Sequence, residues 1–264
     1  MAIEYRWAEG QYDRLPALAA ELARHHVAVI FAAGGDPSAL AAKAATTTIP
    51  IVFIVGSDPA KLGLVASLSR PGGNATGVNL FITEMEAKRL ELLHELVPKA
   101  TVLGVLINPK TAIAEAQLGD VQSAGRLLGQ QIEVFNASNA HDVDIAFANL
   151  ATKKISGLVV TADPFFYNRR DQIISLAARY AIPAVYFFHE FAAAGGLISY
   201  GTSLTGAFHQ VGVYTGKILS GANPAELPVV QPTEFDLVIN LRTAKALGIT
   251  VPQTLLVAAD EVIE

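Results

Sequence analysis

The sequence predicts an α/β protein built from two doubly wound, Rossmann-like lobes with a ligand cleft between them. Short apolar runs rich in β-branched residues alternate with helical segments, which is typical of parallel strands buried on both faces. The alternation forms two blocks that meet near residue 80, and three further segments follow the second block. We therefore expect residues 1–81 plus about 203–228 to form lobe 1, and 82–202 plus about 229–264 to form lobe 2.

In the first block, strands are expected at residues 27–31 and 51–55, with a glycine turn at 34–38 and a helix at 39–46 between them. Strand, glycine turn, helix and strand in this order indicate a βαβ unit. A Pro-Gly-Gly loop at 71–73 precedes a shorter strand at 77–80. Before these elements, the pattern predicts a strand at residues 3–7 and a helix at 12–25.

The second block repeats the alternation and begins with a long helix that Pro98 ends. Its expected helices span 83–97, 112–128, 142–151 and 169–180, and its expected strands span 102–107, 132–135, 157–161, 184–187 and 197–200. The tail continues with a helix at 204–219, a strand at 235–240 and a helix at 243–247. A return of this tail to the first lobe gives two lobes joined by several crossings.

Composition excludes several classes of protein. The 264 residues contain no cysteine, which excludes disulfides, thiolate metal sites and cysteine nucleophiles. The net charge of −5 without a basic tract argues against a nucleic-acid partner. Hydrophobic residues make up 52% of the chain, yet the apolar runs are far shorter than the roughly 20 residues of a membrane helix.

The motifs that would indicate a cofactor or a catalytic centre are missing from the sequence. It contains no Gly-x-Gly-x-x-Gly fingerprint, no Gly-x-Ser-x-Gly elbow and no pair of histidines with metal-ligand spacing. We therefore expect no cofactor, no metal site and no catalytic residue. An enzyme on a doubly wound scaffold, with Asp58 or Asp163 as acid or base, is the alternative that the residues leave open.

Candidate binding residues of the first block follow two expected strands, because ligands bind outside the carboxyl ends of strands in open α/β sheets. The first loop offers backbone N–H groups and a helix N-terminus that suit a carboxylate, and the second offers a hydroxyl and a carboxylate. The candidates are Ala33, Gly34, Gly35 and Ser38 in the first loop, and Gly56, Ser57 and Asp58 in the second. Ordinary turns capped by Asp36, Ser38 or Asp58 would explain the same residues.

Asn108 and Asp163 occupy equivalent places in the second block, each followed by a proline. Phe165 belongs to an aromatic run directly after Asp163, and residues 186–190 form a similar run. An aromatic ring at the cleft could stack on a planar ligand, whereas packing of these rings in the core is the competing explanation. Together these loops fit an amino acid as ligand. Helix N-termini suit its carboxylate, Asp58 or Asp163 suits its ammonium group, and the aromatic residues offer walls for its side chain. This combination favours binding over catalysis.

Several stretches of the chain together resemble a known bacterial family. They are residues 49–53, 58–65, 70–77 with Arg-Pro-Gly-Gly-Asn, 194–201 with Gly-Gly-Leu-Ile-Ser-Tyr-Gly, 237–241 and 258–264. The chain resembles ABC transporter substrate-binding proteins of the type I periplasmic-binding fold, in the branch associated with tryptophan and other aromatic amino acids. The resemblance extends over essentially the whole chain.

This resemblance implies a binding protein rather than an enzyme. Such a protein closes on a small ligand by hinge motion and delivers it to a membrane permease, so a periplasmic or lipid-anchored extracytoplasmic location is expected. The ligand contacts of the family map onto the strand-end loops of both lobes, and they add Tyr186 and His189 to the candidates above. The alternative interpretation is a two-lobed ligand sensor without a transport role.

Two departures from the family pattern lead to further expectations. The sequence starts at what resembles the second strand of the family, so the signal segment and the first βα unit of lobe 1 are expected to be missing. A dimer is expected if a neighbouring chain supplies that first strand. In addition, His189 stands where relatives often carry arginine.

Overall fold

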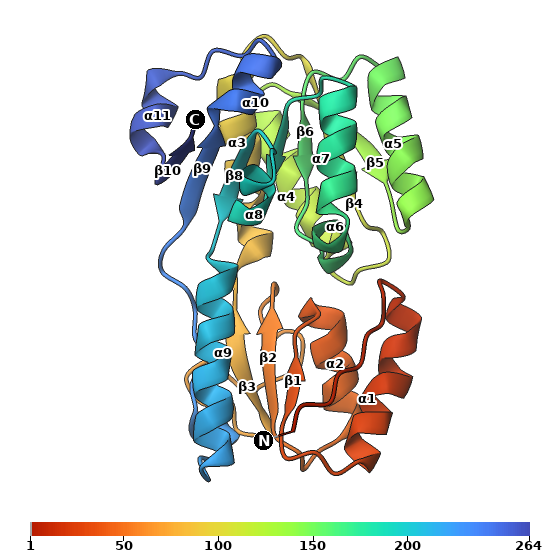
Figure 1. Ribbon diagram of the computed structural model, residues 1–264, viewed down its shortest axis with the longest axis vertical. Helices are drawn as coiled ribbons and strands as arrows, with labels where there is room; N and C mark the ends of the chain where they lie inside the picture. The colour runs from red at the N-terminus through yellow and green to blue at the C-terminus, as the bar shows by residue number, and fades with distance from the viewer. Residues whose placement is uncertain (1) are drawn as a thin grey trace. The chain divides into compact units, whose positions relative to one another are not determined.

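The computed structural model describes residues 2–264, except for the side chains of Thr83 and Glu84 (Figure 1). Met1, at which the first expected lobe starts, lies outside the described residues. The chain divides into two compact units: unit 1 comprises Met1–Phe81 and Leu204–Thr233, and unit 2 comprises Ile82–Ser203 and Glu234–Glu264. The architecture is α/β, with one sheet in each unit, as the sequence predicts.

Unit 1 is built on a three-stranded parallel sheet in the order β1-β2-β3. Its strands are β1 (Ile30–Ala32), β2 (Ile51–Val55) and β3 (Ala75–Asn79). Its helices are η1 (Tyr12–Arg14), α1 (Leu15–Arg24), α2 (Gly35–Ala45), α9 (Leu204–Leu219) and η3 (Pro224–Glu226). Helix α2 contacts β1 and β2, while α9 contacts β2 and β3 and so brings a late part of the chain into this unit.

The core of unit 1 forms because every residue of β2 is buried and apolar. Phe53 and Leu64 are fully buried in this core, and Val229 joins them from the tail. Val230 forms a parallel bridge with Val78, so this tail segment packs with unit 1 for a few residues beyond 228. A Cβ on Gly77 would lie 2.1 Å from the carbonyl oxygen of Phe53, so β3 approaches β2 at a place where only glycine fits.

Unit 2 contains a seven-stranded sheet in the order β10-β9-β8-β7-β6-β4-β5, in which β8 and β9 are antiparallel and the other pairs are parallel. Its strands are β4 (Val102–Ile107), β5 (Gln131–Asn136), β6 (Leu158–Val160), β7 (Ala184–Tyr186), β8 (Ile198–Gly201), β9 (Asp236–Asn240) and β10 (Glu261–Ile263). Its helices are η2 (Ile82–Met85), α3 (Glu86–Leu96), α4 (Ala114–Leu127), α5 (Ala140–Thr152), α6 (Pro164–Asn168), α7 (Arg170–Arg179), α8 (His189–Ala193), α10 (Leu241–Ala246) and α11 (Gln253–Ala258).

Helix α3 shows how the sequence places the core of unit 2. Leu90, Leu93 and Leu96 recur at helical spacing, and all three are buried against the sheet. Leu103 and Val105 of β4 face the same cluster, and both are fully buried. The central strands therefore have apolar side chains on both faces, as expected of parallel strands covered by helices.

The structure corrects the expected elements at several places. Residues 3–7, predicted as a strand, belong to no strand of the described chain. Their contacts are made by side chains instead: Arg6 is bonded to Glu21 of α1, and Glu4 to His25 directly after α1. Strand β1 starts at Ile30 rather than at residue 27, and helix α2 starts at Gly35 rather than at residue 39. The short elements α6, α8, α11 and β10 were not predicted, because segments of three to six residues carry little periodicity.

Among the described residues, no helix combines the length and the apolar character that crossing a membrane requires.

Candidate functional site

The carboxyl ends of β1 and β2 meet at one edge of the unit 1 sheet, and Asp36 joins the two loops that follow them. Its side chain is 6% exposed. One carboxylate oxygen accepts a hydrogen bond of 2.8 Å from the backbone N–H of Gly56, and the other accepts one of 2.5 Å from the hydroxyl of Ser57. Asp36 therefore fixes the loop that carries Gly56 and Ser57, two of the predicted binding residues.

The other predicted groups of unit 1 bond within their own turns. The Ser38 hydroxyl accepts a hydrogen bond from the Gly34 N–H at 2.9 Å and donates one to the Gly35 carbonyl at 2.9 Å. Asp58 accepts a bond of 2.9 Å from the N–H of Ala60, which makes it the cap of its turn. Ala33 and Gly34 are exposed at the loop surface. The capping roles that the sequence left open for Ser38 and Asp58 are thus realised in this structure.

In unit 2 the structure brings two predicted residues into direct contact at the carboxyl ends of β4 and β6. Asn108 and Asp163 are each 3% exposed, and the Asn108 amide donates a hydrogen bond of 3.3 Å to the Asp163 carboxylate. The same carboxylate oxygen accepts a bond of 2.8 Å from the N–H of Phe165, so Asp163 is the N-cap of α6. Because β4 and β6 are parallel neighbours, their ends had to meet at this edge.

The aromatic residues beside this edge pack against one another. Phe165 is 5% exposed, and its ring centroid lies 5.5 Å from that of Phe166. Tyr186 is 1% exposed and stacks on Phe191 at 4.7 Å with an angle of 13° between the rings. Burial raises the pKa of the Tyr186 hydroxyl well above its usual range. In this structure both predicted aromatic residues belong to the packing of unit 2.

His189 lies at the start of α8, three residues after β7 ends. Its Nε2 is 3.0 Å from a carboxylate oxygen of Glu261 in β10, and both side chains are well exposed. Asp236 is close by, and burial, followed by repulsion from Asp260, raises the pKa of its carboxyl group. The predicted His189 therefore faces acidic side chains of its own unit.

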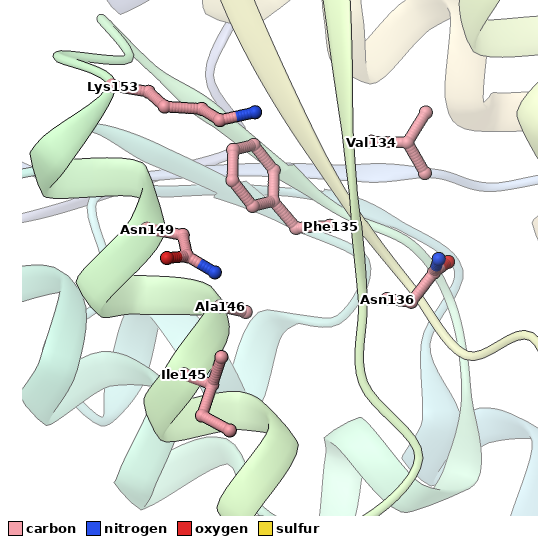
Figure 2. A pocket seen from close by; sticks show the side chains of 7 residues that line it. All are labelled: Val134, Phe135, Asn136, Ile145, Ala146, Asn149 and Lys153. Atoms are coloured by element: carbon pink, nitrogen blue, oxygen red, sulfur yellow. The ribbon is translucent and has the colours of Figure 1, made fainter.

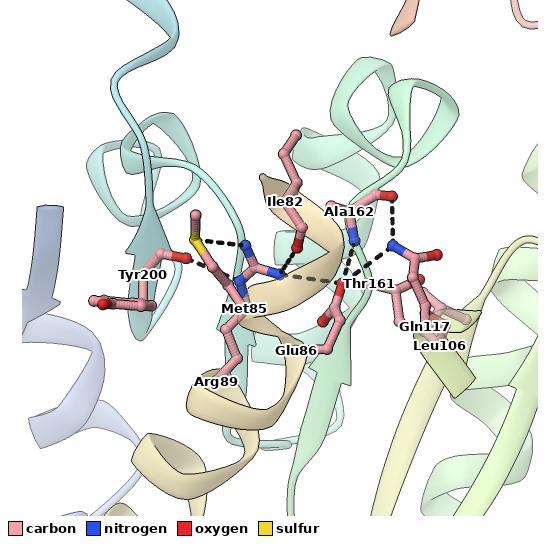
Figure 3. Close-up of polar contacts among 9 residues, drawn as sticks. All are labelled: Ile82, Met85, Glu86, Arg89, Leu106, Gln117, Thr161, Ala162 and Tyr200. Atoms are coloured by element: carbon pink, nitrogen blue, oxygen red, sulfur yellow. Dashed lines mark hydrogen bonds and ion pairs between the residues drawn. The ribbon is translucent and has the colours of Figure 1, made fainter. Parts of the chain in front are cut away.

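A buried polar network includes Ala162, the residue that directly precedes Asp163 (Figure 3). The Oε1 atom of Glu86 accepts hydrogen bonds of 3.0 Å from the N–H of Ala162 and 3.1 Å from the amide of Gln117, and it lies 3.1 Å from a guanidinium nitrogen of Arg89. The guanidinium also donates to the Tyr200 carbonyl at 2.8 Å. Side chains from α3 and α4 are thus bonded to the ends of β6 and β8.

Both charged members of this network are completely buried. Desolvation raises the pKa of Glu86 despite the neighbouring guanidinium of Arg89, and desolvation lowers the pKa of Arg89. The second carboxylate oxygen of Glu86 has no hydrogen-bond partner among the described atoms. The network therefore orders the strand ends while leaving one buried oxygen unsatisfied, which is costly.

Sequence reasoning missed Glu86, Arg89 and Gln117 as residues that order the strand ends, and it considered Asp36 only as a cap of its own turn. A signal for two of them is present in the sequence, because Glu86 and Arg89 share the helix face of Leu90, Leu93 and Leu96. Charged residues on an otherwise apolar helix face indicate a buried ion pair. Asp36 and Gln117 carry no such signal, because both fit ordinary solvent positions in their helices.

The hollows that the structure records in unit 2 lie away from the predicted residues. One of about 150 Å³ lies between β5 and α5, where the Lys153 ammonium is 5.8 Å from the ring centroid of Phe135 (Figure 2). Another lies along α3 and α4 beside the exposed Leu127. No group of three or more His, Asp or Glu side chains within the described chain is arranged to hold a metal ion.

A family model and a curated relative both match this chain. The family model described as ABC transporter substrate binding protein matches residues 1–263. The tyrosine-binding protein of Clostridioides difficile (strain R20291) is 27% identical over 185 residues, which is 70% of this chain and 53% of the relative. The match thus spans about half the length of that curated relative.

Two solved structures share the fold over almost the whole chain. The ABC domain from Streptococcus pneumonia in complex with L-Trp has a TM-score of 0.87 at 22% identity, covering 100% of this chain and 90% of that one. A conserved domain protein from Vibrio cholerae o1 biovar eltor has a TM-score of 0.89 at 27% identity, covering 99% of this chain and 87% of that one.

Proposed function

Because this chain belongs to the family of ABC transporter substrate-binding proteins, we propose that it binds a small carboxylate ligand, and specifically an aromatic amino acid, for an ABC importer. The observation that carries the proposal is the family match over residues 1–263. Proteins of this family bind substrates and are not enzymes, so the candidate residues are assigned to binding. A membrane permease is the proposed partner, and a periplasmic or lipid-anchored location is proposed with it.

The proposal of an aromatic amino acid rests on two kinds of support. The Clostridioides difficile relative is a tyrosine-binding protein, and the Streptococcus pneumonia domain was solved with L-Trp. The strand-end loops carry groups of matching chemistry: the carboxylate of Asp163 suits an ammonium group, and backbone N–H groups at the start of α2 suit a carboxylate. Phe165, next to Asp163, is the proposed aromatic neighbour of the ligand.

We propose that loops of both units contribute to this one site and that the units close on the ligand by hinge motion. The proposed contacts of unit 1 are Ala33, Gly34, Gly35, Ser38, Gly56, Ser57 and Asp58. Those of unit 2 are Asn108, Asp163, Phe165, Tyr186 and His189. The hinge is proposed at the three places where the chain passes between units, after residues 81, 203 and 233.

A thermal-shift screen tests the proposed ligand class. The panel contains L-tryptophan, L-tyrosine, L-phenylalanine, the branched-chain amino acids and several monosaccharides. A ligand at 100 times its Kd stabilises a one-site protein by about 2.7 kcal/mol, so a true ligand raises the melting temperature measurably. We expect the aromatic amino acids to give the largest shifts. A shift with monosaccharides alone would contradict the proposal.

A further inference from the structure

Ala162 connects the end of β6 to the candidate residue Asp163, and side chains of two helices hold both of its main-chain polar groups. Its N–H donates to Glu86 of α3 at 3.0 Å, and its carbonyl accepts from the amide of Gln117 of α4 at 2.9 Å (Figure 3). Glu86, Gln117 and Ala162 are each at most 3% exposed. The position of the Asp163 loop therefore depends on α3 and α4 as well as on the pairing of β6.

Arg89, one helical turn after Glu86, continues this network to the places where the chain enters and leaves unit 2. Its Nε donates to the Tyr200 carbonyl at 2.8 Å, and its Nη1 donates to the Ile82 carbonyl at 3.3 Å. Ile82 is the first residue of unit 2 after the chain passes from unit 1, and Tyr200 lies shortly before the next passage, which follows Ser203. One guanidinium therefore bridges two of the three segments that connect the units.

The third connecting segment is joined to the same place through Tyr200. The ring of Tyr200 stacks on that of Phe235, with centroids 6.1 Å apart and an angle of 24° between the planes. In the β8–β9 ladder Tyr200 also lies opposite Leu237. Unit 2 resumes at Glu234, so Phe235 directly follows the third passage of the chain. All three connecting segments thus enter or leave unit 2 at residues that contact Arg89 directly or through Tyr200.

The stability of the fold does not by itself account for this buried pair. Apolar side chains of similar volume often stabilise a core as well as a buried ion pair does, because both charges lose their hydration. Glu86 and Arg89 are fully buried, and the Oε2 atom of Glu86 has no hydrogen-bond partner among the described atoms. Apolar side chains could not replace the bonds that the pair makes to main-chain groups of the Asp163 loop and of two connecting segments.

We propose that Glu86 and Arg89 are positioning residues for ligand binding, which hold the Asp163 loop and the connecting segments in a fixed relation to each other. A ligand that orders the Asp163 loop then acts on the hinge through the contact of 3.1 Å between Glu86 and Arg89, and closure in turn favours the loop conformation that binds. This inference rests on the binding site and the hinge proposed above. Neither side chain is assigned a contact with the ligand.

The double variant Glu86→Gln/Arg89→Met tests the link, because it removes the bonds to Tyr200 and Ile82 without leaving a buried charge. The carboxamide of Glu86→Gln keeps an oxygen that can accept from the N–H of Ala162. Calorimetric titration with L-tryptophan gives the affinity, and X-ray scattering gives the decrease in the radius of gyration on binding. We expect the double variant to bind about tenfold more weakly than the wild type and to compact less, because apparent affinity falls with the fraction of binding-competent protein.

Leu93→Ala is the matched control for a loss of stability alone. Leu93 lies on the same helix α3, is fully buried in the core of unit 2, and its apolar side chain takes no part in the polar network. This variant should lower the free energy of unfolding and yet leave the affinity and the compaction of the folded protein as in the wild type. A double variant that binds and compacts like the wild type would overturn the proposal, because Glu86 and Arg89 would then only stabilise the fold.

Hydrogen exchange of the ligand-free protein tests the same link without a ligand, and so separates this inference from the proposed function. In the double variant, the amides of residues 82–85, 162–167 and 200–203 should all exchange faster than in the wild type, because the loop and the connecting segments no longer support each other. Unchanged exchange at residues 162–167 would overturn the proposal. Faster exchange at all three places, in a protein whose wild type binds no aromatic amino acid, would support the link and contradict the proposed ligand alone.

Discussion

Asp163 has two roles at the level of single residues, because it caps α6 and is the proposed partner of a ligand ammonium group. Its carboxylate accepts from the N–H groups of Phe165 at 2.8 Å and Phe166 at 3.3 Å. Asparagine caps helices as well as aspartate does, so Asp163→Asn keeps the cap while it removes the charge. This substitution therefore separates binding from folding.

We expect Asp163→Asn to retain the stability of the wild type and to bind an aromatic amino acid at least tenfold more weakly. A hydrogen bond to a charged group contributes about 1.5–3 kcal/mol, and 1.4 kcal/mol corresponds to a factor of ten. Calorimetric titration gives the affinity, and urea unfolding gives the stability. Unchanged affinity in a folded variant would remove Asp163 from the site.

Asn240 provides the matched control for a buried cap. It is 5% exposed, caps α10 through the N–H of Thr243 at 3.1 Å and donates to the Ala192 carbonyl at 3.1 Å. Because β9 is antiparallel to β8, Asn240 lies at the sheet edge opposite to Asp163. Asn240→Ala should lower the free energy of unfolding by about 1–2 kcal/mol and leave the affinity of the folded protein unchanged.

The buried pair of Glu86 and Arg89 leads to a stability prediction. Arg89→Met removes the only guanidinium that faces the buried carboxylate among the described contacts, and such a change typically costs about 3–5 kcal/mol. The double variant Glu86→Gln/Arg89→Met removes the buried charge as well, so it should recover most of that loss. Urea unfolding measures both. A double variant that is less stable than Arg89→Met alone would contradict this account.

The raised pKa of Glu86 predicts the sign of a pH effect. The folded protein holds the Glu86 proton more tightly than the unfolded chain, because burial penalises the carboxylate. The free energy of unfolding of the wild type should therefore fall as pH rises above the ordinary value of 4.5, relative to that of Glu86→Gln, which does not ionise. Measuring the free energy of unfolding of both proteins across this pH range tests the prediction. A wild type that gains stability relative to Glu86→Gln as pH rises would contradict it.

At the level of elements, the close approach of β8 to the loop after β7 depends on one glycine. A Cβ on Gly201 would lie 2.0 Å from the carbonyl oxygen of Phe187, which is backbone and has no freedom to rotate away. Gly119 in α4 is the matched control, because a Cβ there would meet nothing within 4 Å. Both positions are glycines, but only Gly119 has room for a side chain.

We expect Gly201→Ala to destabilise unit 2 strongly, so that the protein unfolds early or is recovered in low yield. Gly119→Ala should instead raise the free energy of unfolding by about 0.5–1 kcal/mol, because alanine is the better helix former. Thermal and urea unfolding distinguish the two results. Equal stability of both variants would show that β8 has room to move.

The sequence predicted the elements in which apolar residues recur with regular spacing, and it missed those that depend on tertiary contacts. Strand β2 and strand β4 were predicted with their observed bounds, and so was helix α9, because long apolar runs or helical spacing define them. The segment at residues 3–7 has the alternation of a strand, but its backbone has no partner among the described strands. The spacing of apolar residues shows which face of a segment is apolar. A segment becomes a strand only when its backbone is hydrogen-bonded to a neighbouring strand.

The sequence selected strand-end loops as the candidate site, and this assignment stays a prediction. The structure adds a contact that the sequence did not predict, the hydrogen bond of 3.3 Å between Asn108 and Asp163. The sequence could not reveal that Ser38 and Asp58 bond within their own turns, because a cap and a ligand contact require the same residue types. It also could not reveal Asp36, whose role depends on a loop 20 residues away.

At the level of the whole molecule, the chain consists of two α/β units, each with strand-end loops that carry polar groups. The chain belongs to the family of ABC transporter substrate-binding proteins. An aromatic amino acid is the ligand proposed above for this chain. The account therefore depends on one property of the folded protein, which is specific binding of such a ligand.

Calorimetric titration of the folded chain with L-tyrosine and L-tryptophan tests this property most directly. The account predicts a saturable isotherm with one ligand per chain for at least one of the two, and much weaker binding by Asp163→Asn. A protein that unfolds cooperatively, yet releases no heat with any aromatic amino acid while it binds a ligand without a carboxylate group, would contradict the account.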